Sequence, residues 1–144
     1  MIEEDTIKLL RECDSGSKMG ISSIEDVLMY VNSETLKQHL LNSKKEHESI
    51  NTRIQELLDN YQDEGKNPNL IIQGMSKVKT KMELIMNESD CKIADLMTDG
   101  CNMGIKTLNK YLNEYEAADE KSKNLTKELI AVEEKLLKNI RPYL

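Results

Sequence analysis

The sequence predicts an all-α protein, a bundle of four long helices with a further helix in the connection between the second and the third. Apolar residues recur at spacings of three, four and seven over stretches far longer than a β-strand. Only two Pro and six Gly interrupt the 144 residues. All five aromatic residues are Tyr, whereas a large sheet protein is richer in aromatic and β-branched residues. A chain of this length is expected to form one domain, over residues 1–144.

The first half of the chain predicts a helical hairpin formed by residues 3–31 and 34–62. Between the two segments, Asn32 and Ser33 supply side-chain oxygens of the kind that cap a following helix. The apolar side of the first segment comprises Leu9, Leu10, Cys13, Ile24, Val27, Leu28 and Val31. The second segment has the most regular apolar face of the chain, formed by Leu36, Leu40, His47, Ile50, Ile54, Leu57 and Tyr61.

A polar stretch after Tyr61 ends this pattern, and Asn67-Pro68 restarts it with a capping side chain followed by Pro at the first helical position. We expect a shorter crossover helix at about 68–86. A second hairpin, at about 91–115 and 119–142, completes the chain. Its last helix carries an apolar stripe of Leu125, Leu129, Val132, Leu136, Ile140 and Tyr143.

The charge balance argues against a nucleic-acid-binding surface. The chain has 26 acidic and 20 basic side chains and a net charge of −6, and nucleic-acid affinity comes largely from basic residues. Residues 1–5 are acidic where a secretory signal is basic, and no apolar run approaches the roughly 20 residues of a membrane span. We therefore expect a cytoplasmic protein that binds neither nucleic acid nor membrane. Cys13, Cys91 and Cys101 are odd in number and form no CxxC pair, so no disulfide is expected.

The sequence contains an internal repeat at an offset of 84 residues. Each copy is followed by a polar turn and a long helix, which gives the order helix pair, crossover helix, helix pair. The repeated residues are Gly16, Met19, Gly20 and Ile21 in the first copy and Gly100, Met103, Gly104 and Ile105 in the second.

The repeated glycines lie inside helical stretches, where each Gly costs up to about 1 kcal/mol relative to Ala. We expect close packing between the helices over 3–31 and 91–115 to offset this cost. The residues expected at the close contact are Gly16, Gly20, Gly100 and Gly104. Two alternatives remain open: the gap beside the glycines admits a small ligand, or each helix breaks there.

The breaks have local support in the sequence. Ser22-x-x-Glu25 fits a capping box, in which two side chains satisfy the first N–H groups of a new helix. Asp99-Gly100 has the composition of a turn.

Two helical hairpins joined by a crossover long enough to hold its own helix is the organisation of ferritin-like four-helix bundles. The chain resembles a family of small uncharacterised bacterial ferritin-like proteins over nearly its whole length. The resemblance is a pattern of glycine and apolar spacing, and it implies a fold rather than a reaction. It is carried by Lys18-Met19-Gly20-Ile21 and by Asp99-Gly100-Cys101-Asn102-Met103-Gly104-Ile105-Lys106-x-Leu108-x-x-Tyr111-Leu112.

Ligand count excludes the di-iron site of metal-active ferritin-like proteins. That site takes a Glu from each of two helices and a Glu-x-x-His from each of the other two. Three residues before His47 the chain has Lys44, and the final helix contains no His. The residues that come closest to a ligand set are Glu46, His47 and Glu128. We expect no metal or other cofactor, with His47 packed in the core and hydrogen-bonded across the bundle.

The sequence therefore predicts a non-catalytic structural or protein-interaction bundle that lacks the ferritin-type di-iron site, with a second copy or another protein as its partner. The alternative is a degenerate ferritin-like metal-binding protein. It uses carboxylates and His47. A site of carboxylates alone would draw on Glu12, Glu46, Asp95 and Glu128. No sequence motif of a hydrolase, a phosphate loop or a metalloprotease is present, so enzymatic activity is not expected.

Overall fold

The structure is a computed structural model that describes residues 2–66 and 89–144. These residues form four long α-helices, a short 3-10 helix and no strand. The elements are α1 (Ile2–Leu28), α2 (Glu34–Asn60), α4 (Asp90–Glu114), α5 (Glu120–Ile140) and η1 (Arg141–Tyr143). The predicted all-α class is confirmed, as is the packing of four long helices together. The crossover helix predicted at 68–86 lies outside the described residues.

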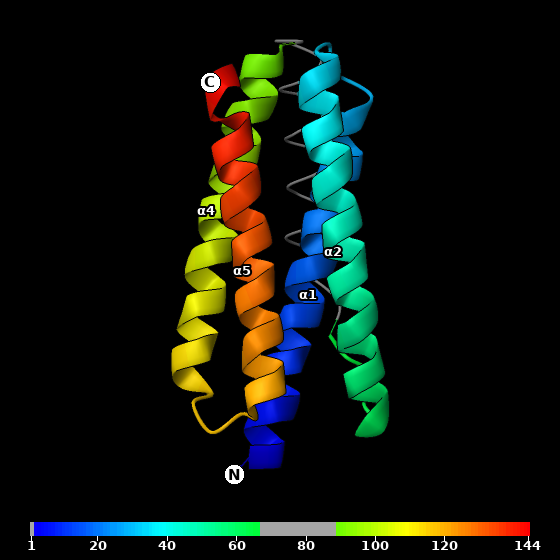
Figure 1. Cartoon of the computed structure of the whole chain (residues 1–144), viewed down its shortest axis with the longest axis vertical. Helices are drawn as coiled ribbons and strands as arrows, with labels where there is room; N and C mark the ends of the chain where they lie inside the picture. The colour runs from blue at the N-terminus through cyan, green and yellow to red at the C-terminus, as the bar shows by residue number, and fades with distance from the viewer. Residues whose placement is uncertain (1, 67–88) are drawn as a thin grey trace.

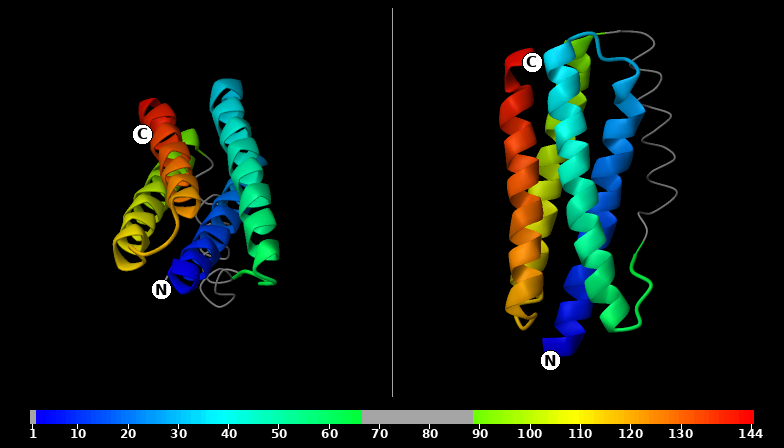
Figure 2. Two further views of the ribbon diagram at one scale, coloured as in Figure 1. Left: turned by 60° about the horizontal axis from the view of Figure 1, so that its bottom comes forward. Right: turned by 45° about the vertical axis from the view of Figure 1, so that its right-hand side comes forward.

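The four helices form a bundle of two antiparallel hairpins, α1 with α2 and α4 with α5 (Figure 1). Across the bundle, α2 packs against α5 and α1 against α4, as the further views in Figure 2 also show. The helices α2 and α4 run in the same direction, and so do α1 and α5. Among the described helices, none combines the length and the apolar character that a bilayer crossing requires.

Hydrogen bonds between the hairpins tie their ends together. At one end, the Asp90 carboxylate accepts from the backbone N–H groups of Asn32 and Ser33 at 2.8 and 2.9 Å. At the other end, the N–H of Asp119 donates to the Thr6 hydroxyl at 2.9 Å. The first turn of α4 therefore meets the α1–α2 turn, and the α4–α5 turn meets the start of α1.

Side-chain caps set the starts of three helices. The Ser33 hydroxyl accepts from the N–H of Leu36, the Ser89 hydroxyl from that of Lys92, and the Asp119 carboxylate from that of Ser122. These residues satisfy N–H groups that have no partner within the helix. The cap at Ser33 is the one that the sequence indicated.

The helices are continuous through the repeated glycines, so the alternative of a break there is wrong. The helix α1 runs without interruption past Gly16 and Gly20, and α4 past Gly100 and Gly104. A Gly within a helix keeps its backbone hydrogen bonds, and packing elsewhere in the bundle offsets its unfavourable propensity.

The core consists of two apolar clusters, one at each end of the bundle. One cluster contains Leu9, Leu10, Cys13, Ile50, Ile54, Leu58, Leu108, Ala118, Leu125, Leu129, Ile130 and Val132. The other contains Ile24, Val27, Leu36, Leu40, Ile93, Ala94, Met97, Cys101, Leu136 and Ile140. Along α2 and α5, the buried residues between the clusters include the polar side chains of Ser43, His47 and Glu133. A polar layer thus separates the two clusters, and this layer forms the candidate site.

Candidate functional site

His47 and Glu133 form a buried pair that joins the two hairpins through the middle of the bundle. The Nε2 atom of His47 on α2 lies 2.7 Å from Oε1 of Glu133 on α5. The two residues are 1% and 8% exposed. A buried carboxylate or imidazolium is strongly disfavoured without a partner, so each side chain depends on the other.

Both ring nitrogens of His47 are engaged. Nδ1 lies 2.7 Å from the backbone carbonyl oxygen of Ser43 one turn earlier. A carbonyl oxygen only accepts, so Nδ1 carries a proton and donates it. The other nitrogen faces a carboxylate, and together the two acceptors favour the doubly protonated imidazolium. His47 was expected to use one nitrogen across the bundle; the structure occupies the second as well.

The environment raises the pKa of His47 above its ordinary value. Burial acts in the opposite direction, since it disfavours the charged ring, but the hydrogen bond and the negative charge of Glu133 and the Ser43 carbonyl outweigh it. The nearby Glu46, on the same helix, also favours the charged form. Imidazolium and carboxylate together form a closed ion pair, in which neither ring nitrogen keeps a lone pair for a metal ion.

The raised pKa predicts that the contribution of His47 to stability falls as the pH rises. The ordinary imidazole pKa is 6.5. Below that value the folded and unfolded chains both bind the proton, and the contribution is complete. Between 6.5 and the folded-state pKa, the folded chain keeps a proton that the unfolded chain has lost, so the free energy of unfolding declines.

We expect urea unfolding to show this decline as the pH rises above the ordinary imidazole value of 6.5 in the wild type and a flatter profile in His47→Gln. The other titratable groups near the pair are Glu46, on α2, and Cys101, on α4, which faces Glu133. Both remain in the variant, so the difference between the two profiles isolates His47. Coincident profiles would contradict the assignment.

Two of the four repeated glycines lie directly beside this pair. A Cβ built at Gly20 would stand 2.6 Å from both Cδ2 and Nε2 of the His47 ring. A Cβ at Gly104 would stand 3.6 Å from the carboxylate carbon of Glu133. The two glycines are equivalent positions of the internal repeat, but only Gly20 has to lack a Cβ, because the distances at Gly104 are those of ordinary van der Waals contact. The space beside them thus holds a polar side chain of the chain itself.

The other two glycines differ from each other. A Cβ at Gly16 would be in ordinary contact with side chains of Leu108 and Leu129, at 3.8 and 3.9 Å. At Gly100 a Cβ would have no atom of the described residues within 4 Å, and the residue is exposed. The close packing predicted at Gly100 is therefore wrong, because this position lies on the outside of α4 rather than toward the core.

Cys13, Cys91 and Cys101 are free thiols in the structure. Burial, together with the neighbouring Glu133 carboxylate, raises the pKa of Cys101 far above its usual range. Burial raises the pKa of Cys13 to about 12, although its sulfur lies 3.0 Å from the Thr126 hydroxyl. The thiolate is the form that attacks electrophiles and binds metals, so neither buried cysteine is suited to that chemistry. Cys91 is exposed.

The carboxylates considered as metal ligands do not meet. Glu46 accepts from Lys135 Nζ at 3.0 Å and Glu128 from Arg53 Nη1 at 2.9 Å, both on the surface. The remaining two, Glu12 and Asp95, lie beside Lys66 and Lys92. In residues 2–66 and 89–144, no group of three or more His, Cys, Asp or Glu is placed to hold a metal ion.

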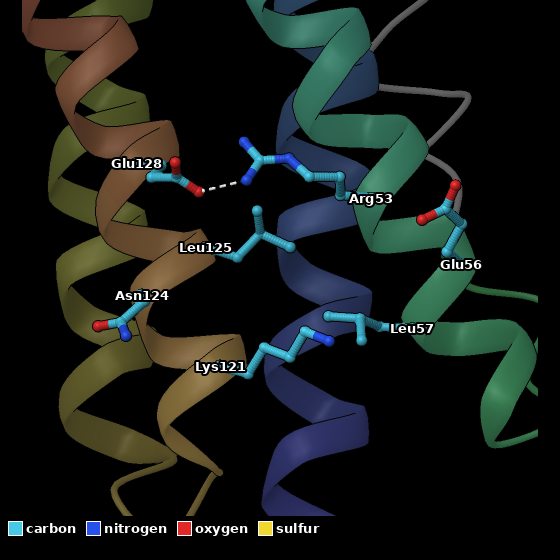
Figure 3. Close-up of a pocket in the computed structure, with 7 residues that line it drawn as sticks. All are labelled: Arg53, Glu56, Leu57, Lys121, Asn124, Leu125 and Glu128. Carbon is cyan, nitrogen blue, oxygen red and sulfur yellow. Dashed lines mark hydrogen bonds and ion pairs between the residues drawn. The ribbon is translucent and has the colours of Figure 1, made fainter.

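A shallow groove of about 320 Å³ runs along the surface between α2 and α5. In Figure 3 the Arg53–Glu128 ion pair crosses the groove, and Leu125 and Leu57 lie below this pair in the view. The other residues that line the groove are polar or charged. Its lining residues are Arg53, Glu56, Leu57, Lys121, Asn124, Leu125 and Glu128. None of the repeated glycines lines this groove, so it is not the ligand pocket that the sequence left open.

Glu133 is the member of the site that sequence reasoning missed. It follows Leu129 by four residues and precedes Leu136 by three, so it lies on the apolar stripe of its helix. A carboxylate on an apolar stripe needs a buried partner. His47 is the only imidazole on the apolar stripe of α2. The position of Glu133 on the apolar stripe of α5 could therefore have predicted that the two side chains pair.

Comparison with models of protein families, with curated proteins and with solved structures gives no match for this chain.

Proposed function

We propose that this chain is a non-catalytic structural or protein-interaction bundle with ferritin-like topology, in which a closed His–Glu pair occupies the centre. The observation that carries the proposal is the complete engagement of the pair. Nδ1 of His47 meets the Ser43 carbonyl and Nε2 meets Glu133, both at 2.7 Å. Such an arrangement links two hairpins and fixes their relative position.

The path of the chain supports the ferritin-like topology. The two hairpins each pack internally and against one another, and α2 and α4 run in the same direction. Parallel second and third bundle helices are a feature of ferritin-like folds with one long crossover connection.

The surface carboxylates support a role without metal chemistry. Glu46 and Glu128 each bind a cation of the facing helix, Lys135 and Arg53 respectively. Both pairs join α2 to α5, so these residues add to the contact between hairpins. Because all four side chains are partly or largely exposed, each pair stabilises the fold by at most about 1 kcal/mol.

Metal content tests this proposal. We expect tag-free protein, loaded aerobically with ferrous iron or with zinc and freed of excess, to retain far less than one ion per chain. The matched variants are Glu133→Gln, which changes the buried pair, and Glu128→Gln, which changes a surface pair. Stoichiometric metal in the wild type would refute the proposal in favour of a metalloprotein. Its loss in Glu133→Gln would place the metal at the buried pair, and its loss in Glu128→Gln would place it at the surface carboxylates.

A further inference from the structure

The outer face of α4 is an exposed surface with an ordered charge pattern. Its buried residues, among them Ile93, Met97 and Leu108, point toward α1 and α5, and Figure 1 shows α4 at the edge of the bundle. The residues on the opposite side recur at spacings of three and four and are exposed. The α4 outer face comprises Asp95, Asp99, Asn102, Met103, Lys106 and Lys110.

Acidic and basic residues are segregated along this face. Asp95 and Asp99 are one turn apart in the first half of the helix, and Lys106 and Lys110 are one turn apart in the second half. Like charges at this spacing destabilise a helix that stands alone. Within residues 2–66 and 89–144, neither Asp99 nor Lys106 forms an ion pair. Asp95 Oδ2, by contrast, lies 3.6 Å from Lys92 Nζ on the same helix. Asp99 and Lys106 are therefore the charges of this face that have no counterpart in the described part of the chain.

Met103 occupies the middle of the face and is 71% exposed. It is one of four large hydrophobic side chains that the described residues leave exposed. The side chains on either side of it in the face are polar or charged. An apolar centre with a charged rim is the usual composition of a protein-protein contact.

The charge pattern of the α4 outer face is complementary to the same pattern on a second copy of the helix that runs in the opposite direction. Asp99 precedes Asn102 by three residues, and Lys106 follows Met103 by three. In the same way, Asp95 precedes Asn102 by seven residues and Lys110 follows Met103 by seven. If two copies of α4 lie antiparallel with their midpoints together, each Asp faces a Lys of the other copy. A two-fold axis at the midpoint would also bring the two Met103 side chains together.

We infer that the partner of this bundle is a second copy of the chain, bound antiparallel along the α4 outer face. The inference rests on the proposed interaction function and names its partner. It predicts an isologous dimer, in which the same patch is used by both copies. Four Asp–Lys pairs form the rim, and they supply orientation more than affinity. One helix against one helix gives a small contact, so the dimer is expected to be reversible and sensitive to salt.

Charge reversal tests the inference by sedimentation velocity from micromolar to millimolar concentration at low and high salt. We expect concentration-dependent dimers of the wild type that weaken in high salt. Two double variants, Asp95→Lys with Asp99→Lys and Lys106→Asp with Lys110→Asp, should each remain monomeric, because both halves of the face then have the same charge. An equimolar mixture of these two variants should form a heterodimer. The quadruple variant, which exchanges all four charges, should recover the homodimer.

A control variant distinguishes the effect of the α4 outer face on dimerisation from the effect of net charge. Glu46→Lys with Glu128→Lys changes the net charge by as much as the first double variant, on the α2–α5 side, and should dimerise as the wild type does. A wild type that is monomeric throughout, or double variants that dimerise like the wild type, would overturn the inference. Neither result touches the proposed function, which metal content tests independently of molecular mass.

Discussion

Replacing Glu133 by Ala should lower the free energy of unfolding by about 3–5 kcal/mol, because it leaves the His47 ring buried without its carboxylate. The ring cannot turn to water, since it is 1% exposed and its other nitrogen donates to the Ser43 carbonyl. His47→Ala should have an effect of similar size, because it leaves Glu133 without its partner. Urea unfolding followed by circular dichroism near pH 6, where the imidazolium is favoured, measures both.

Two comparisons make this prediction specific to the buried pair. Glu46→Ala removes a surface partner of Lys135 and should change the free energy of unfolding by less than about 1 kcal/mol. The double variant His47→Leu with Glu133→Leu should be more stable than either Ala variant, since it leaves no buried charge without a partner. If Glu133→Ala proves no more harmful than Glu46→Ala, the pair does not have the structural role assigned to it.

Gly20→Ala and Gly100→Ala should change stability in opposite directions, although the two positions lie in matching copies of the internal repeat. A Cβ at Gly20 would stand 2.6 Å from two atoms of the His47 ring, and that ring is held at both nitrogens. Moving the ring strains the pair, and we expect destabilisation by about 1–3 kcal/mol, the usual range for overpacking. This loss exceeds the gain of up to about 1 kcal/mol that Ala brings to a helix.

At Gly100 only the gain in helix propensity applies, because a Cβ there would meet no atom of residues 2–66 and 89–144 within 4 Å. Gly100→Ala should therefore stabilise the chain by about 0.5–1 kcal/mol. Thermal and urea unfolding of both variants test the pair of predictions. In a His47→Ala background the effect of Gly20→Ala should become much smaller, since the ring is gone. Stabilisation by Gly20→Ala in the wild-type background would show that the ring does not occupy this space.

The sequence was sufficient to predict the four long helices of the described residues and much of what lies on their inner faces. The stripe that contains Leu36, Leu40 and Ile54 has the 3.6-residue period of a helix, and these residues are buried. His47 fell on the same stripe, which was enough to predict a packed and hydrogen-bonded imidazole. The first helix ends at Leu28, somewhat before the predicted end at residue 31, because side-chain periodicity does not define where a helix stops.

The tertiary structure decided which residue pairs with His47. It also decided which repeated glycines face the core and which face outward. Periodicity assigns a residue to the inner face of its own helix, but the contact across the bundle depends on how far each helix is turned and shifted against its neighbours. His47 and Glu133 are 86 residues apart in the chain, and only the packing of α2 against α5 sets them at the same level. Gly16 and Gly100 are equivalent positions of the repeat, yet Gly16 faces Leu108 and Leu129 whereas Gly100 faces outward. The local sequence determined which residues form helices and which face is apolar, whereas the rotation and register of the hairpins determined which polar groups meet.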